Sequence, residues 1–195
     1  MDNNQKFIYY KYALVGDSSV GKELLFKKLS KGDFSEKNIS TIGSDKRTIS
    51  FTNLDVEDFK GNKIKKSFEI SLFDTAGQER FRSISKRYFK DSQGIILIYD
   101  ITNRITFDHL EMWLSSIKEA LSDWESSNYM IMILGNKLDL VNNNERKREV
   151  FIEEVEKKYR NSGIFIGGEC SLKEFSDSQI LEIIKNFTVK IFNKI

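Results

Sequence analysis

Residues 16–23, with the sequence GDSSVGKE, have the spacing of a phosphate-binding loop, GxxxxGK, up to their last residue. In such a loop the backbone N–H groups surround a phosphate, and the lysine, here Lys22, reaches its outer oxygens. The next residue is normally Ser or Thr, whose hydroxyl binds magnesium, but here it is Glu23. The predicted nucleotide-binding residues of this loop are Gly16, Asp17, Ser18, Ser19, Val20, Gly21, Lys22 and Glu23.

The surroundings of this loop decide between a ligand site and a ligand-free turn between a strand and a helix. The bare pattern is weak in a chain of 195 residues with 11 glycines. It follows an apolar run that ends at Val15, however, and precedes an amphipathic segment with Leu24, Leu25 and Leu29. A strand before the loop and a helix after it are what the motif requires, so we favour the phosphate site.

A second polar segment, DTAGQE at residues 74–79, follows the apolar run 68–73. An aspartate at the carboxyl end of a strand faces the crevice where α/β sheets bind ligands, so Asp74 is predicted to hold magnesium through a water. Gly77 would let the backbone approach a terminal phosphate, and Gln78 could orient an attacking water. By itself, the segment is equally well explained as a solvated turn.

A third segment, GNKLD at residues 135–139, follows the apolar run 129–134. The carboxylate of Asp139 can accept two hydrogen bonds from a base with adjacent N–H and NH₂ donors. Guanine has these donors and adenine does not. The segment therefore predicts a guanine site and argues against a kinase that uses ATP.

The elements that must position these segments are short apolar runs alternating with amphipathic stretches. The runs 7–15, 68–73, 94–100, 129–134 and 163–168 have strand length, and apolar spacing typical of helices recurs in 107–121, 150–159 and 180–191. A hairpin is predicted around residues 60–62, at a sheet edge. We expect an α/β fold with a six-stranded, mostly parallel sheet, one antiparallel edge strand and helices on both faces.

Composition adds few constraints on function. The 31 basic and 29 acidic residues give a net charge of +2, which does not suggest a nucleic-acid partner. The single cysteine excludes an intramolecular disulfide and favours a reducing, cytoplasmic setting. We expect one domain, residues 1–195, and a monomer, without a secretory signal or a membrane-spanning run.

Together these motifs resemble those of the Ras superfamily of small GTPases, and within it the Rab branch, from about Lys11 to the last predicted helix. The segments GDSSVGK, STIG, DTAGQERF, NKLD and ECSLK occur in the order of their Rab-type counterparts. The resemblance implies the P-loop GTPase fold, GTP or GDP and Mg²⁺ as ligands, and a switch whose two loops are ordered by the terminal phosphate. It also implies an exchange factor, a GTPase-activating protein and effectors as partners.

The resemblance assigns roles to further residues. Thr41 would bind magnesium and the attacking water, and Phe34 would stack on guanine. Hydrolysis would use Gln78, Thr41, Lys22 and Gly77. The guanine site would contain Asn136, Lys137, Asp139, Ser171, the backbone of Leu172, and Lys173.

Three departures from the Rab pattern qualify these expectations. Glu23 can coordinate a metal but repels the diphosphate, so we predict weaker magnesium dependence, faster nucleotide loss and slow hydrolysis. Lys46 stands where the Rab pattern has an aromatic residue, and the hairpin that follows is unusually long. Because Rab effectors bind this region, the resemblance does not predict which effectors this chain would bind. The sequence lacks terminal cysteines, so attachment to endomembranes would require a prenylated tail. We expect either that such a tail is missing from this chain or that the chain is a soluble relative.

These departures, Glu23 and Lys46 above all, leave a second interpretation open: a catalytically weak or nucleotide-independent scaffold on the same fold, which binds nucleotide loosely or not at all and recruits partners regardless of GTP. Three further residues are given structural roles. His109 is expected at the surface, Trp113 in the core, and Cys170 as a small packed residue rather than a nucleophile.

Overall fold

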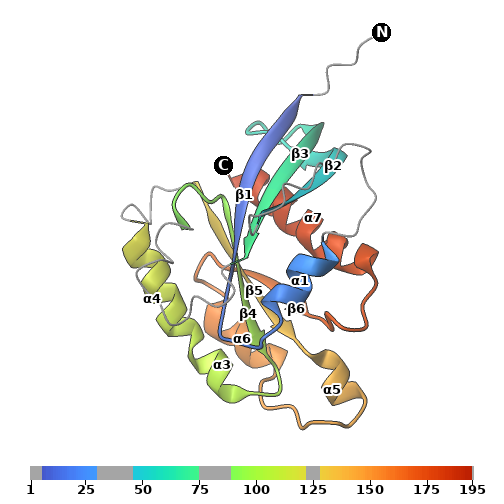
Figure 1. The fold of residues 1–195 in the computed structure, drawn as a ribbon. Coiled ribbons are helices and arrows are strands. Elements are labelled where there is room, and N and C mark those ends of the chain that lie inside the picture. Colours follow the sequence, from blue (N-terminus) through green and yellow to red (C-terminus); the bar gives the residue numbers. More distant parts are fainter. Residues whose placement is uncertain (1–5, 30–45, 75–88, 122–127, 195) are drawn as a thin grey trace.

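The computed structural model describes residues 6–29, 46–74, 89–121 and 128–194, which form a central sheet flanked by helices (Figure 1). The strands are β1 (Phe7–Val15), β2 (Lys46–Glu57), β3 (Lys63–Asp74), β4 (Gly94–Asp100), β5 (Met130–Asn136) and β6 (Phe165–Glu169). The helices are α1 (Lys22–Lys28), α3 (Arg104–Asp108), α4 (Leu110–Ala120), α5 (Leu138–Asn142), α6 (Ile152–Tyr159) and α7 (Asp177–Lys194).

The strands form a six-stranded sheet in the order β2-β3-β1-β4-β5-β6. Only the β2–β3 pair is antiparallel, and β2 lies at the edge, as the sequence predicts. β1 pairs in parallel with both β3 and β4, and the series continues in parallel through β5 and β6. The carboxyl ends of the five parallel strands therefore point the same way, which is the edge where α/β sheets bind ligands.

Helices cover both faces of this sheet because alternate strand residues point to opposite sides. On one face, Tyr12 and Leu14 of β1 belong to a buried cluster that includes residues of α1 and α7. On the other face, Ala13 and Val15 belong to a cluster that includes residues of α3, α4 and α6. Every residue of β4 is buried, since this strand has helices on both sides. The predicted fold class is confirmed.

The β2–β3 hairpin is built around Asp58, whose carboxylate accepts hydrogen bonds from the backbone N–H groups of Lys60 and Asn62, both at 2.8 Å. Gly61 has a positive φ of 77°, which side-chain-bearing residues rarely adopt. The turn lies where Lys60, Gly61 and Asn62 predict it. Lys46, the departure noted in the sequence, is exposed at the start of β2.

The helices in the described ranges include none that combines the length and the apolar character needed to cross a bilayer.

Candidate functional site

The predicted site segments meet at the carboxyl edge of the sheet. The loop 16–21 follows β1, Asp74 ends β3, Asp100 ends β4 and Asn136 ends β5. Residues 170–173 follow β6 at the same edge. The parallel topology thus brings together segments that are up to about 150 residues apart in the sequence, at the edge where open α/β sheets bind ligands.

The loop after β1 turns back on itself through residues with positive φ. Gly16, Ser19 and Gly21 have φ values of 138°, 62° and 115°. Lys22 is 5% exposed, and its Nζ donates to the backbone oxygens of Gly16 at 2.7 Å and of Asp17 at 2.5 Å. The lysine therefore holds the loop in a closed turn from within, while Ser18 and Ser19 are exposed on its outside.

Gly21 permits a close approach that any side chain would prevent. A Cβ atom there would lie 2.3 Å from Nδ2 of Asn136, and the positive φ adds strain. We expect Gly21→Ala to destabilise the protein by about 2–3 kcal/mol and to lower Tm by roughly 5–10 °C. The matched control is Gly61→Ala, since Gly61 also has a positive φ but nothing lies within 4 Å of its Cβ position.

Thermal unfolding followed by circular dichroism measures both variants. Gly61→Ala should cost only about 1 kcal/mol, from backbone strain alone. Equal Tm values for the two variants would show that the contact with Asn136 does not constrain the loop.

Asn136 joins the phosphate-loop segment to the segment after β6. Its Nδ2 donates to the backbone oxygen of Val20 at 2.8 Å, and its Oδ1 accepts from the backbone N–H of Leu172 at 3.0 Å. Asn136 is 3% exposed, so both bonds are shielded from water. One side chain thus fixes the distance between the two halves of the predicted nucleotide site.

Asp139 lies beside this bridge, at the start of the short helix α5, and is 4% exposed. Its Oδ1 accepts from Oγ of Ser171 at 2.8 Å, and Oγ of Ser171 accepts in turn from the backbone N–H of Glu174 at 3.0 Å. The serine thereby orients the carboxylate. No hydrogen bond to the second oxygen, Oδ2, is found from the part of the chain that the structure describes.

Lys137 has a left-handed backbone, φ 73°, and its Nζ lies 2.7 Å from Oδ2 of Asp100. The other oxygen of Asp100 accepts from the backbone N–H and the hydroxyl of Thr102, at 2.9 and 2.7 Å. Asp100 is buried and was not predicted as a site residue. The sequence pattern that predicts Asp74 would also have identified Asp100, because both are aspartates at the end of an apolar strand. Lys173 is exposed.

Glu23 points outward along α1. Its carboxylate lies 2.6 Å from Nζ of Lys27, one turn later, and both side chains are about two-thirds exposed. The hydrogen bond from Lys27, followed by its positive charge, lowers the pKa of Glu23. The charge that the sequence places beside the phosphates is therefore paired with a lysine, away from the interior of the loop.

Several predicted residues lie outside the described ranges: Phe34, Thr41, Gly77 and Gln78. Of Asp74 only the backbone is described, paired with Leu14 in β1. Among the residues that are described, no three His, Cys, Asp or Glu side chains gather as a metal site. A magnesium site here would accordingly draw on Thr41 and Asp74, with Glu23 offering an oxygen ligand of the right chemical type.

His109 is exposed, as expected, whereas the core assignment of Trp113 needs correction. Both contact the carboxylate of Asp17, in the phosphate loop: Nδ1 of His109 at 2.6 Å and Nε1 of Trp113 at 2.8 Å. Trp113 is only partly buried, so it is not simply a core residue. Trp113 is four residues after His109, and residues four apart lie on the same face of a helix, so the sequence could have predicted that these two side chains lie together.

Cys170 is fully buried, and burial, with smaller contributions from Asp139 and Glu169, raises the pKa of its thiol to about 12. Because the thiolate is the reactive form, we expect a maleimide at pH 7.5 to label the native chain at least about a hundredfold more slowly than the unfolded chain. The chain has a single cysteine, so mass spectrometry reads this site alone. A Ser115→Cys variant, on the exposed side of α4, provides a reactive control. Equal labelling of Cys170 in both states would contradict its burial.

Fold and loop together define a class: P-loop α/β proteins, with a glycine-rich loop after the first strand and the NKLD segment at the end of β5. The Ras family model matches residues 11–192. The Ras-related protein Rab-13 of Bos taurus is 39% identical over 155 residues, covering 80% of this chain and 68% of the relative. The Ras-related protein Rab11A of Lotus japonicus is 36% identical over 194 residues, covering 99% and 78%. This chain belongs to the Ras family and is Rab-like.

Proposed function

We propose that this chain is a Rab-like switch that binds GTP and GDP and hydrolyses GTP slowly, and that residues 1–195 form one such domain. The observation that carries the proposal is the double hydrogen bond of Asn136, which sets the phosphate loop at a fixed distance from the segment around Asp139. A nucleotide has its phosphates and its base at two ends, and these two segments would bind one end each.

At the base end, the Oδ2 atom of Asp139 accepts from guanine while Ser171 holds Oδ1. The backbone N–H of Leu172 is predicted to donate to the guanine oxygen, but in the structure it donates to Oδ1 of Asn136. On nucleotide binding this N–H would therefore have to share its hydrogen bond between the two acceptors or exchange one for the other. The ion pair with Asp100 fixes the end of the Lys137 side chain, so its aliphatic part is the portion that packs on the base. Phe34 is proposed to cover the base from the other side.

At the phosphate end, Lys22 turns from the carbonyls of Gly16 and Asp17 toward phosphate oxygens, and the amides of the loop donate to the same group. Thr41 and Gln78 hold the attacking water, and the amide of Gly77 binds a terminal phosphate oxygen. Magnesium, when bound, supplies positive charge to the phosphates, and Thr41 with Asp74 would hold it.

The rival function is a scaffold that does not hydrolyse nucleotide, and Glu23 is the residue that favours it. Single-turnover hydrolysis of bound GTP, with and without magnesium, separates the two. We expect measurable hydrolysis with magnesium, and its loss in Gln78→Ala with GDP binding retained. Stable GTP in the unmodified chain at millimolar magnesium would reject the enzymatic proposal and favour the scaffold.

Relatives named as Rab proteins support partners of three kinds: an exchange factor, a GTPase-activating protein and effectors that read the two switch loops. We propose a monomer in the cytoplasm or at the surface of endomembranes, in vesicle traffic. Stable membrane attachment would require a lipid anchor such as a prenyl chain.

A further inference from the structure

The Asp17 carboxylate, inside the phosphate loop, is held from outside that loop. Each of its oxygens has its own partner: Oδ2 lies 2.6 Å from Nδ1 of His109, and Oδ1 accepts from Nε1 of Trp113 at 2.8 Å. His109 is the residue between α3 and α4, and Trp113 is one helical turn further along α4. These three side chains, the Asp17 clasp, join the loop to the corner of two helices.

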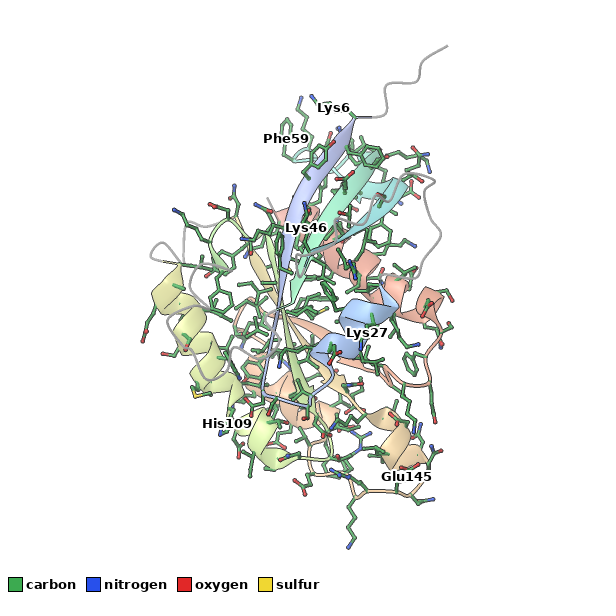
Figure 2. All side chains as sticks on the ribbon, viewed as in Figure 1. Lys6, Lys27, Lys46, Phe59, His109 and Glu145 are labelled. Atoms are coloured by element: carbon green, nitrogen blue, oxygen red, sulfur yellow. The ribbon has the colours of Figure 1, made fainter. Side chains whose placement is uncertain are left out.

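The backbone of Asp17 is held from the opposite direction. Its carbonyl oxygen accepts from Nζ of Lys22 at 2.5 Å, beside the bond from the same ammonium to Gly16. In Figure 2, His109 and Lys27 of α1 lie on opposite sides of the loop that leaves β1. Asp17 therefore connects the lysine that reaches phosphate to helices on the other face of the sheet.

The direction in which the Asp17 carboxylate points affects the electrostatics of the phosphate loop as well as its position. A carboxylate in a phosphate loop repels the bound anion unless it is turned away or neutralised. The bonds to His109 and Trp113 direct the Asp17 carboxylate toward the α3–α4 corner, where only 18% of the side chain is exposed. Packing of the Trp113 ring against the core would not by itself require its indole N–H to donate to Oδ1 of Asp17, so the hydrogen bond is a separate feature.

We propose that His109 and Trp113 are positioning residues for the phosphate loop, and that they slow nucleotide release through Asp17. They hold its carboxylate away from the phosphates and fix the position of Asp17 within the loop. The inference rests on the proposed nucleotide binding. It concerns the phosphate end only, so the preference for guanine over other bases is unaffected.

The first experiment measures release of a fluorescent GDP analogue at millimolar magnesium. Trp113→Phe, which keeps an aromatic ring but removes the donor, should release it about tenfold faster, equivalent to ~1.4 kcal/mol. His109→Ala should act in the same direction. His109→Asn should recover slow release, because its amide can donate from nearly the same position as Nδ1. Ser115→Ala, on the exposed side of α4, is the control and should match the unmodified chain.

A double-mutant cycle tests whether Trp113 acts through Asp17. If it does, Trp113→Phe has no further effect in an Asp17→Ala background, since the interaction is already absent. Additive effects, or equal release rates for Trp113→Phe and Ser115→Ala, would overturn the proposal.

A second measurement needs no nucleotide. The chain has two tryptophans, so Trp124→Phe leaves the Trp113 indole as the only one. Its indole N–H resonance should shift when Asp17→Ala is added, and shift again when GDP binds the protein with Asp17 intact. An indole resonance insensitive to Asp17→Ala would overturn the clasp itself. A chain that binds no GDP but shows the Asp17-dependent shift would refute the proposed function and leave the clasp as a structural link.

Discussion

Asp139→Asn is expected to weaken GDP binding by about a hundredfold to ten-thousandfold. The reason is the loss of an acceptor for two charge-assisted hydrogen bonds, each worth roughly 1.5–3 kcal/mol. The variant keeps the oxygen that accepts from Ser171, so the local network should survive. The second oxygen, which has no hydrogen bond from the described residues, becomes an NH₂ donor that faces the donors of guanine.

The same change predicts a new preference. Xanthine carries a carbonyl where guanine carries its NH₂ group, and the amide of the asparagine can donate to that oxygen. Isothermal titration with GDP, XDP and ADP would show XDP binding more tightly than GDP in the variant, with ADP weak throughout. Unchanged GDP affinity would place the guanine site elsewhere. Glu174→Gln, an exposed change beside Ser171, is the control and should leave the order of nucleotides unchanged.

Glu23→Ser is expected to slow GDP release by roughly a hundredfold at millimolar magnesium. Two effects act in the same direction: the variant removes a negative charge beside the phosphates and supplies the hydroxyl that the loop pattern normally places on the metal. The pairing of Glu23 with Lys27 softens the repulsion in the unmodified chain, but it also engages the carboxylate away from the interior of the loop.

Glu23→Gln separates the two contributions, because it removes the charge without introducing a hydroxyl. We expect it to slow release only partly. Glu156→Ser, at an exposed position of α6, controls for a general effect of the substitution. The decisive comparison is the effect of a chelator. Release from the unmodified chain should respond weakly, and release from Glu23→Ser strongly. A strong chelator response in the unmodified chain would show that Glu23 does not impair the metal site.

Sequence periodicity predicted most of the elements because the pattern is physical. β1 and β4 have the bounds expected from their apolar runs. β4 is buried along its whole length, and a strand covered on both faces must be apolar throughout. The stretch 107–121 was less well predicted, because the structure interrupts it at His109, between α3 and α4. α5 is only five residues long, too short to show an apolar period.

The sequence by itself determined the chemistry of this protein: a loop with the spacing for a phosphate, an aspartate suited to guanine, and a carboxylate at a metal-binding position. These are local features, fixed by residue type and spacing. Tertiary structure alone decided that Asn136 bridges the two halves of the site, that Asp100 holds Lys137, and that His109 and Trp113 bind Asp17. These contacts join residues that are remote in the chain, and they exist only because parallel strands bring their carboxyl ends to one edge of the sheet.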